Sequence, residues 1–425
     1  MGLEENSIQG AIPLPELDRC VVCGLCLPVC PTYQELQLES ASPRGRLALI
    51  RGLLKHKLPE SADLDKPLSL CLQCRACEWV CPAGVKFGWL IDTARRHWQV
   101  AHPRRRTLAE KLIYWMALLS GRQRQKLAGL IEVTRKTGLL RLARLTGLAQ
   151  LLGLGQALNL LPPVTRRFKL AERYTSGVPD PGRVSLFTGC MGHVLDPETL
   201  SATISVLTKL GYDVLVPPTQ VCCGALHSHD GDFDTAQSLA QQNIAAFGDS
   251  DTPVISVVSG CGLALSEYGH YDADSIAGKE FGSRVTDISS FLESITWPSN
   301  ATLKPLAARV LVQDPCSLRN NSRAVANVYE LLRRIPGLEV KALEGNASCC
   351  GGAGIYPVRE PAMATKLRDK KLASLTNQNA DFLVSANLGC AIHIRSGLKA
   401  DSSETEIIHP VTLIDRQLKK QGTED

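Results

Sequence analysis

The feature that most constrains this chain is a run of four closely spaced cysteines that occurs twice. The pattern is C-x2-C-x2-C-x3-C-P, and it lies at Cys20, Cys23, Cys26 and Cys30 in one copy and at Cys71, Cys74, Cys77 and Cys81 in the other. The N-terminal stretch has no basic segment followed by an apolar one, so we expect no secretory signal. In a reducing compartment, clustered cysteines indicate metal or redox sites rather than disulfides.

The spacing of these two runs is the bacterial ferredoxin spacing for [4Fe–4S] clusters. Three thiolates separated by two residues wrap one cubane cluster, and the fourth reaches across to the other cluster. Structural zinc is the alternative, but the third cysteine and the Cys-Pro ending disfavour it. We therefore predict two clusters with these ligands: Cys20, Cys23, Cys26 and Cys81 for the first, and Cys71, Cys74, Cys77 and Cys30 for the second.

The stretch between the two runs predicts a helical type of ferredoxin domain. About 40 residues separate the runs, and residues 42–55 begin with Ser-Pro and continue with helical spacing. Arg44, Arg46 and Arg51 lie in this helix. They either offset the negative charge of the thiolates or form a solvated face.

The second half of the chain contains an internal repeat that holds the other eight cysteines. Each copy has a cysteine, a Cys-Cys-Gly triplet 32 or 33 residues later, and a last cysteine after 38 or 40 more. Such spacing indicates a duplication. We call the copies the first and second CCG units. Their cysteines are Cys190, Cys222, Cys223 and Cys261, and Cys316, Cys349, Cys350 and Cys390.

Each CCG unit alternates β-rich and helical stretches, which predicts parallel α/β domains. Residues 183–190 and 252–261 read as strands in the first copy, and residues 308–316 and 380–390 read as strands in the second. The single cysteines follow these strands. Ligands gather beyond the carboxyl ends of parallel strands, so we expect both sets of thiols there.

Four thiols in each CCG unit suffice for a further cluster, a zinc ion or a thiol redox site. Adjacent cysteines do not readily form a disulfide with each other, because the geometry is strained. The glycine after each pair lets the backbone approach closely. Nearby histidines are alternative ligands, although single histidines are more often structural. They are His193, His227, His229 and His393.

The segment between the cysteine-rich halves is strongly basic. Residues 95–173 hold 17 Lys or Arg and three Glu, a net charge of +14, whereas the whole chain carries +5. This favours a docking surface for an acidic protein or an anionic membrane. A solvated helical face is the alternative. Residues 145–161 carry no charge; they are a weak transmembrane candidate and fit a buried or interfacial helix better.

We therefore expect an α+β multidomain protein of 425 residues. Residues 1–100 form a helical two-cluster ferredoxin-like domain, and residues 101–180 form a basic helical linker. Residues 181–305 and 306–425 form two duplicated α/β CCG domains. The sequence has no G-x-G-x-x-G between a strand and a helix and no P-loop, so we expect no flavin on this chain and no nucleic-acid partner.

The repeated C-x31-CCG-x37-C pattern resembles the cysteine-rich domain of heterodisulfide reductase-type subunits. Such domains usually end in C-x-x-C, but Val258 and Asn387 stand where the first cysteine of that pair would be. A five-thiolate noncubane cluster is therefore not expected with the usual ligands. The chain as a whole resembles the iron–sulfur subunits of bacterial glycolate oxidase. The motifs are CVVCGLCLPVCPTY, SPRGRLALI, CLQCRACEWVCPAGV, VCCGA, SGCG, CCGGAGIYPV and ANLGC.

This resemblance implies an electron-transfer subunit of an acceptor-linked glycolate dehydrogenase complex. FAD-binding subunits would oxidise glycolate to glyoxylate and pass electrons to this chain, which would deliver them to quinone or another acceptor. It also implies a cytoplasmic location, peripheral at the inner face of the cytoplasmic membrane. The alternatives are the iron–sulfur subunit of a lactate or glycerol-3-phosphate dehydrogenase, and a heterodisulfide reductase-like thiol–disulfide enzyme.

Overall fold

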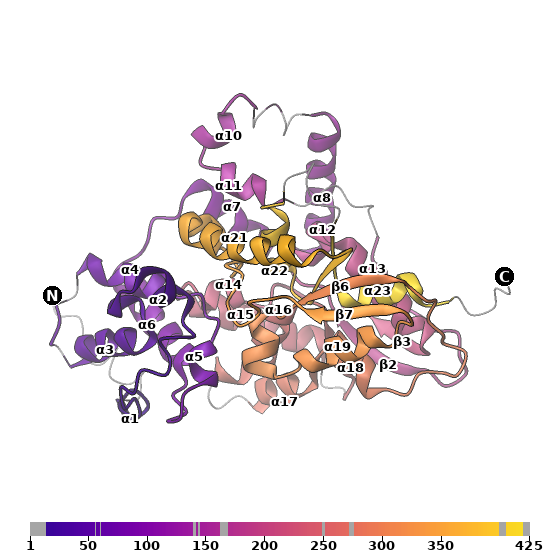
Figure 1. Cartoon of the computed structure of the whole chain (residues 1–425), viewed down its shortest axis with the longest axis horizontal. Coiled ribbons are helices and arrows are strands. Elements are labelled where there is room, and N and C mark those ends of the chain that lie inside the picture. The colour runs from indigo at the N-terminus through magenta and orange to yellow at the C-terminus, as the bar shows by residue number, and fades with distance from the viewer. Residues whose placement is uncertain are drawn as a thin grey trace.

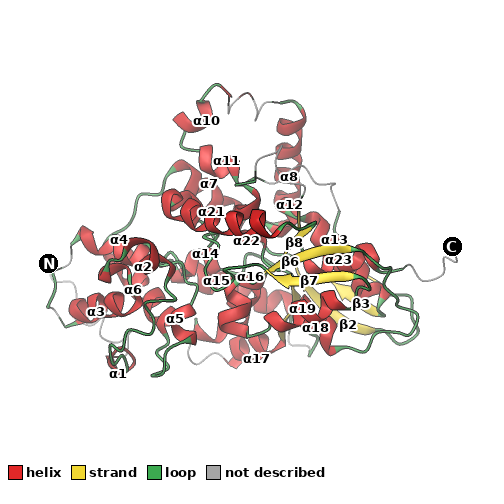
Figure 2. Ribbon diagram, in the orientation of Figure 1, coloured by secondary structure: helices red, strands yellow, loops and turns green. Residues whose placement is uncertain are grey.

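The structure is a computed structural model that describes residues 14–55, 57–59, 61–138, 142, 145–161, 169–248, 251–271, 276–398 and 405–419. Most of the N-terminal stretch, for which we expect no secretory signal, lies outside these residues. Helices fill one end of the molecule and strands gather at the other (Figure 2). The chain runs from the helical end, through helices that project from the middle, to the strand-rich end (Figure 1).

The N-terminal region is built from short helices around the two cysteine runs, and no strand occurs among its described residues. The helices are α1 (Leu14–Asp18), α2 (Pro31–Leu36), η1 (Glu39–Ala41), α3 (Pro43–Leu54), η2 (Ala62–Leu64), α4 (Asp65–Ser69), α5 (Ala76–Trp79) and α6 (Phe87–Ala101). A core that includes Leu47, Ile50, Leu90 and Ile91 joins α3 to α6. This agrees with the helical type of ferredoxin domain.

Helix α3 shows how the local sequence sets these helices. Ser42 is its N-cap, and the Ser42 hydroxyl accepts a hydrogen bond from the Gly45 amide at 2.9 Å. Pro43 occupies the first helical position, where no amide hydrogen is needed. Gly45 fits closely against the preceding turn, because a Cβ there would lie 1.9 Å from the Glu39 carbonyl oxygen.

The basic segment forms helices that stand beside the CCG units. They are α7 (Leu108–Leu118), α8 (Gly121–Lys136), α10 (Leu148–Leu151) and α11 (Gly155–Asn159). In Figure 1, α8 and α10 project at the top of the molecule. No described helix is both long and apolar enough to cross a bilayer. The uncharged residues 145–161 instead hold the short helices α10 and α11, which disfavours a transmembrane span there.

The first CCG unit contains a five-stranded sheet with the order β1-β3-β2-β4-β5, parallel except for β1. The strands are β1 (Arg173–Tyr174), β2 (Gly182–Phe187), β3 (Tyr212–Leu215), β4 (Val254–Ser256) and β5 (Val285–Asp287). The helices are α12 (Gly192–Leu195), α13 (Pro197–Lys209), α14 (Ala225–Ser228), α15 (Phe233–Phe247), α16 (Ser259–Ser266), η3 (Tyr268–His270), α17 (Ile276–Arg284) and α18 (Ile288–Ser294).

The second CCG unit contains a parallel sheet with the order β7-β6-β8-β9, which matches the order β3-β2-β4-β5 of the first. The strands are β6 (Ala308–Gln313), β7 (Leu338–Ala342), β8 (Phe382–Ser385) and β9 (Glu406–Ile408). The helices are the π-helical turn η4 (Ser317–Ser322), α19 (Val325–Arg333), α20 (Tyr356–Arg359), α21 (Pro361–Gln378), α22 (Leu388–Arg395) and α23 (Pro410–Gln417).

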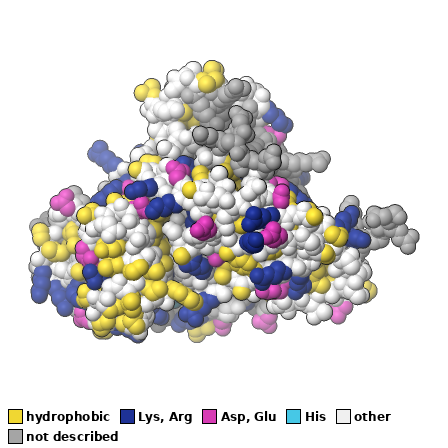
Figure 3. All heavy atoms as spheres, viewed as in Figure 1, with side chains coloured by type: hydrophobic (Ala, Val, Ile, Leu, Met, Phe, Trp, Pro, Cys, Tyr) yellow, Lys and Arg dark blue, Asp and Glu magenta, His cyan; other side chains and the backbone are white. Residues whose placement is uncertain are grey.

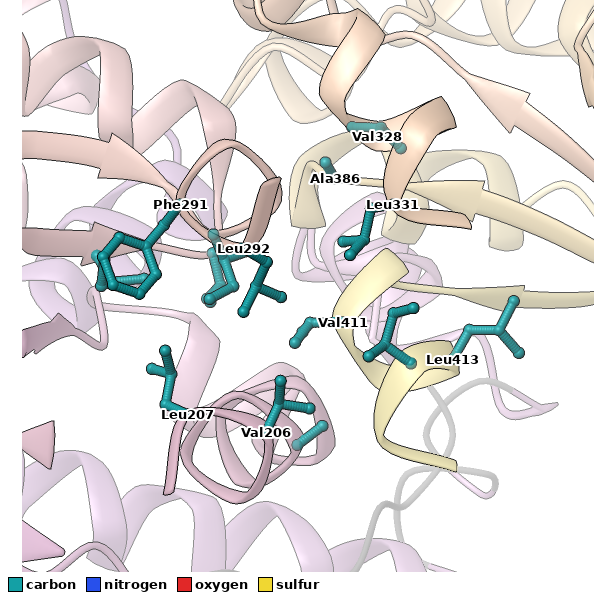
Figure 4. Packing of buried hydrophobic residues seen from close by; sticks show 14 of the residues in the cluster. Val206, Leu207, Phe291, Leu292, Val328, Leu331, Ala386, Val411 and Leu413 are labelled. Atoms are coloured by element: carbon teal, nitrogen blue, oxygen red, sulfur yellow. The ribbon is translucent and has the colours of Figure 1, made fainter. Parts of the chain in front are cut away.

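One hydrophobic core joins the two units (Figure 4). Val206 and Leu207 of α13 lie near Val411 of α23, and Leu292 of α18 lies in the same cluster as Leu331 of α19. Each unit thus places helices against the other in a reciprocal way. The α+β fold, with an N-terminal iron–sulfur domain and two duplicated α/β units, is as the sequence predicts.

Candidate functional site

The first cysteine run forms a loop at the surface, which we call the outer loop (residues 20–26). Cys20, Cys23 and Cys26 line one small hollow, and Cys81 from the second run lines it too. Cys23 is exposed, whereas Cys20, Cys26 and Cys81 are half-buried. The hollow is thus lined by all four cysteines predicted for the first cluster and also by Cys77, which is predicted for the second.

The second run forms a deeper loop, the inner loop (residues 71–77). Burial, with the nearby Cys74 and Cys71, raises the pKa of the Cys77 thiol well above its usual value, and Cys30 also contributes. Cys30 is buried and immediately precedes α2, whose first residue is Pro31. The proline therefore starts a helix that fixes the direction from which Cys30 approaches the inner loop.

Both loops share an unusual backbone around their middle cysteine. Val22 and Gly24 flank Cys23 with φ of 55° and 83°, and Gln73 and Arg75 flank Cys74 with φ of 54° at each. A β-branched or long residue in this left-handed region is strained. The same strain in both runs indicates loops that are shaped around a bound group.

A buried arginine lies beside this group of thiols. The Arg46 side chain is 1% exposed, and its Nη1 lies 4.0 Å from the Cys30 sulfur. It also donates to the Thr32 hydroxyl at 3.0 Å and to the Pro67 carbonyl at 2.6 Å. No carboxylate pairs with Arg46 among the described residues. A buried cation of this kind favours anionic sulfur nearby.

The other two arginines of the predicted helix have different surroundings. Arg44 donates to the Val22 carbonyl at 3.3 Å, so it lies against the outer loop, and it also pairs with Glu39. Arg51 pairs with Asp18 and donates to the Leu17 carbonyl, so it fixes α1.

The inner loop lies directly against the second CCG unit. Burial and the nearby Cys316 raise the pKa of the Cys74 thiol. Against the opposing effect of Cys316, the neighbouring Cys350 and burial raise the pKa of Cys349, and Cys74 adds to this. The Asn320 amide donates to the Cys74 carbonyl at 2.8 Å, and the Tyr356 hydroxyl donates to the Leu70 carbonyl at 3.1 Å. Half-buried Cys74 and Cys316 pack against one small core that contains Cys349.

The four thiols of each CCG unit contact one another in sequence. In the second unit, the Cys350 sulfur lies 2.8 Å from the Cys390 sulfur, and Cys349 and Cys316 continue the row. The first unit repeats this row with Cys190, Cys222, Cys223 and Cys261. All these cysteines are free.

Among the described residues, no group of three or more His, Cys, Asp or Glu side chains is arranged to hold a single metal ion.

The glycine after each cysteine pair is required by the backbone. Gly224 and Gly351 adopt left-handed conformations, with φ of 85° and 81°. A Cβ at Gly351 would lie 2.7 Å from the Ala364 carbonyl oxygen, and one at Gly224 would lie 3.3 Å from that of Ala236. The close approach predicted from the sequence is therefore present in both units.

Val258 and Asn387 both precede a helix at the end of a strand. Val258 is the N-cap of α16, and Asn387 is the N-cap of α22. The Asn387 side chain accepts a hydrogen bond from the Gly389 amide at 3.2 Å, so it serves as a helix cap. The two positions lie close together across the units, because the Ser259 amide donates to the Ala386 carbonyl at 3.1 Å.

The histidines near these cysteines form other contacts. His227 pairs with Asp232 at 2.9 Å, and His229 pairs with Asp92 at 3.3 Å. His393 contacts the Ala364 carbonyl at 3.0 Å. His193 is buried, and burial lowers its pKa. These contacts favour structural roles.

Several residues at this junction escaped the sequence analysis. Arg75 of the inner loop pairs with Glu267 of the first CCG unit and with Asn321 of the second. Asn320 and Tyr356 hold the inner loop in place. A cavity of about 900 Å³ lies between the three parts, and Arg75, Glu267 and Asn321 line it. No short-range signal marks such residues, because their partners lie hundreds of positions away.

The residues of both loops fit iron–sulfur clusters. The donor sets contain only sulfur, the loops are bent into left-handed conformations, and a buried arginine lies beside Cys30. Burial raises the pKa of the Cys74 and Cys77 thiols, so iron must displace their protons to bind. The CCG rows likewise offer only sulfur donors.

Comparisons with known proteins agree with this arrangement. A family model described as a 4Fe-4S dicluster domain matches residues 16–85, and one described as a cysteine-rich domain matches residues 184–266 and 310–395. The chain is 34% identical to the probable glycolate oxidase iron-sulfur subunit of Bacillus subtilis (strain 168), with 96% of each chain covered.

Two further relatives define how far the similarity extends. The glycolate oxidase iron-sulfur subunit of Escherichia coli (strain K12) is 28% identical, with 95% of each chain covered. Lactate utilization protein A of Shouchella clausii (strain KSM-K16) is 26% identical, but the match covers only 53% of this chain and 95% of that protein. The matches to the glycolate oxidase subunits thus include both the loops and the CCG units, and the chain belongs to the family of glycolate oxidase iron–sulfur subunits.

Proposed function

We propose that this chain relays electrons within a glycolate-oxidising complex, from flavin-containing subunits to a membrane acceptor, with quinone as the favoured one. The observation that carries the proposal is the placement of the two loops: the outer one is exposed, and the inner one lies against the second CCG unit. The proposal includes four units, at residues 1–100, 101–180, 181–305 and 306–425.

The outer loop has the properties of an entry point for electrons. Cys23 is exposed, and Val21, Val22 and Leu25 beside it expose more than half of their side chains. Hydrophobic side chains gather over this end of the molecule (Figure 3). A flavoprotein that docks on this apolar surface would come close to the cluster proposed for Cys20, Cys23, Cys26 and Cys81.

The inner loop has the properties of the second redox centre on the electron path. Its proposed ligands are Cys71, Cys74, Cys77 and Cys30, and Cys74 lies beside Cys316 and Cys349. The two loops share the region around Cys77, which lines the outer hollow as well. Bound clusters would pass single electrons between these sites. The protein holds the two loops next to each other and shields the inner one from water.

The division of labour supports a flavin partner. Oxidation of a 2-hydroxy acid needs a hydride acceptor, normally a flavin or nicotinamide. The sequence has no G-x-G-x-x-G between a strand and a helix, which is the fingerprint of many dinucleotide sites. We therefore assign substrate oxidation to other subunits, and to this chain the passage of electrons towards the inner face of the cytoplasmic membrane.

Lactate is the second candidate substrate. Similarity to lactate utilization protein A favours it, but that match covers 53% of this chain against 96% for the glycolate oxidase relative of Bacillus subtilis. We therefore favour glycolate. A thiol–disulfide enzyme is favoured less, because Val258 and Asn387 occupy the positions of the missing cysteines.

The test is iron and sulfide analysis with EPR on the anaerobically purified full chain, followed by assays with its flavoprotein subunits. We expect about eight irons if only the loops hold clusters, and about twelve to sixteen if the CCG rows also hold them. A chain without any EPR-active cluster would refute the relay.

A single substitution then separates relay from oxidation. Cys71→Ser should remove the inner cluster and stop electron flow to the acceptor, while glycolate still reduces the flavin. Ser69→Ala, two residues upstream, is the control and should leave both steps intact. Loss of flavin reduction in the Cys71→Ser complex, or lactate outperforming glycolate as reductant, would contradict the assignment.

A further inference from the structure

Helix α7 presents an apolar face to solvent. Leu108, Leu112, Trp115 and Leu118 lie on one side of the helix, because three or four residues separate each from the next. Their exposed fractions range from 39% for Leu112 to 53% for Trp115. A solvent-exposed helix face normally carries polar residues, so this face has a different purpose.

The opposite face of α7 is firmly attached to the protein. Glu110 is buried and pairs with Arg359 at 2.9 Å. The Tyr114 hydroxyl donates to the Leu226 carbonyl at 3.3 Å, and Ala117 belongs to the core of the first CCG unit. Thr107 and Glu110 form a capping box that fixes the start of the helix. The apolar face is therefore held in a fixed orientation.

A basic hollow adjoins the start of this helix. Its volume is about 880 Å³, and five cationic side chains against two carboxylates line it: Arg96, Arg104, Arg105, Arg106 and Lys111, with Asp232 and Asp234. Arg104, Arg105 and Lys111 are exposed. Lys111 also lies between the apolar residues of α7, so cationic and apolar groups form one continuous surface.

Exposed apolar groups are concentrated in this part of the chain. Of 19 exposed large hydrophobic side chains among the described residues, 11 lie between residues 100 and 152, and only one, Ile276, lies in the CCG units. Helix α7 carries four of the 11, and α8 and α10, which carry three more, project from the molecule (Figure 1). The apolar exposure therefore belongs to the basic segment and not to the surface in general.

We propose that the exposed face of α7 and the adjoining basic hollow bind the surface of a bilayer that contains anionic lipids. Leu and Trp enter the boundary between headgroups and acyl chains, as in interfacial helices. The exposed Arg104, Arg105 and Lys111 meet the lipid phosphates, and their long stems allow their charges to remain at the headgroup level. Charge complementarity selects an anionic bilayer as the occupant.

This inference rests on the membrane association in the proposed function and names the surface responsible. Its test measures binding alone, so its failure would leave the electron relay untouched. The anaerobically purified full chain is mixed with vesicles of phosphatidylcholine alone or with a third of phosphatidylglycerol, and the bound fraction is measured by sedimentation. We expect binding only to the anionic vesicles, and weaker binding at high salt. Equal binding to both vesicles, or binding to neither, would overturn the proposal.

Two variants test the two halves of the surface. R104E with R105E should weaken partitioning onto anionic vesicles about tenfold or more. L112S with W115S should weaken it too and leave its salt dependence in place. The control, R183E with K304E, makes the same change of charge at exposed positions of the CCG units and should bind as the unchanged chain does.

A second readout places the helix itself. Trp115 should be quenched by brominated acyl chains in the bilayer, and W115F should lack that part of the quenching. Reduction of a soluble dye by the lipid-free complex should be the same for all variants. If R104E with R105E instead loses its flavoprotein subunits while vesicle binding is unchanged, the face docks a protein and the proposal is wrong.

Discussion

The two CCG units have the same architecture but different neighbours. Their strands follow the same order, their thiols form the same row, and a left-handed glycine follows each cysteine pair. In the second unit, Cys316 and Cys349 lie against the inner loop. In the first, the basic helices take that place, since Arg124 of α8 donates to the Gly189 carbonyl at 2.8 Å. Duplication made two equivalent thiol sets, and the surroundings distinguish them.

This difference orders the molecule from one end to the other. The outer loop, the inner loop and the second CCG unit are successive neighbours. Helix α7, whose exposed face we assign to the bilayer, packs against both units, through the Leu226 carbonyl in the first and through Arg359 in the second. The same fold thus supplies one thiol row beside the inner loop and one beside α8, which illustrates that the surroundings of a site, and not the fold alone, set its function.

The largest effect should come from breaking one thiol row at a time. Cys349→Ser should shift the midpoint potential of the inner cluster by on the order of tens of millivolts, because Cys74 packs against the small core that contains Cys349. Cys222→Ser, at the equivalent place in the first unit, should leave that potential unchanged. Redox titration followed by EPR measures both. Equal shifts in the two variants would mean that the units are not distinguished by their neighbours.

The glycines after the cysteine pairs allow the two units to be compared through the free energy of unfolding. Gly351→Ala should lower the free energy of unfolding by about 3 kcal/mol. The strain of the left-handed backbone adds to the clash of the new Cβ, which would lie 2.7 Å from the Ala364 carbonyl oxygen. Gly224→Ala should cost about 1–2 kcal/mol, because its nearest neighbour lies at 3.3 Å. The shift in the urea midpoint of the metal-loaded chain reports the difference.

Gly177→Ala is the control for those two variants. It also has a positive φ, 78°, but nothing lies within 4 Å of an added Cβ. It should therefore show the backbone strain alone. A larger loss at Gly177 than at Gly351 would contradict the importance of the close approach to α21.

The sequence predicts the cysteine loops and the repeated units because both depend on local spacing. The β-rich runs became β2, β4, β6 and β8, and the stretch beginning at Ser42 became α3. Spacing also predicts which cysteines share a cluster, and this grouping stays a prediction, since the outer hollow is lined by Cys77 as well as by Cys20, Cys23, Cys26 and Cys81.

Long-range packing is what the sequence did not reveal. Nothing near Cys74 indicates that the second CCG unit rather than the first would face it, since both carry the same motif. Arg46 was one of three arginines that fitted either charge compensation or a solvated face. Of these three arginines, only Arg46 is buried, because its guanidinium group donates to the Thr32 hydroxyl and the Pro67 carbonyl. Such choices are made by tertiary contacts between distant segments.

The smallest effect concerns one pair of equivalent helix caps. Asp287 is the last residue of β5 and caps α18, and His409 follows β9 and caps α23. Their places correspond, because Asp287 pairs with Ser256 of β4 and His409 directly follows Ile408, which pairs with Val384 of β8. Burial raises the pKa of Asp287 to about 6 and lowers that of His409 to about 3.

The two caps should oppose each other as the pH changes. Because the folded pKa of Asp287 is about 6, its ionisation lowers the free energy of unfolding as the pH rises from about 4 to about 6. The folded pKa of His409 is about 3, whereas the pKa of histidine in the unfolded chain is about 6.5. His409 therefore lowers the free energy of unfolding as the pH falls below about 6.5, by about 2 kcal/mol at pH 5. Between pH 4 and 6 the two slopes therefore cancel.

Asparagine at either position keeps a capping side chain and removes the titration. Asp287→Asn should make stability rise more steeply with pH between 4 and 6, because only the histidine effect remains. His409→Asn should make stability fall over the same range, and the double variant should regain the original slope. Urea midpoints measured at half-unit pH intervals give all four slopes. Parallel changes in the two single variants would contradict the burial of both caps, because burial raises the pKa of a carboxyl and lowers that of an imidazole.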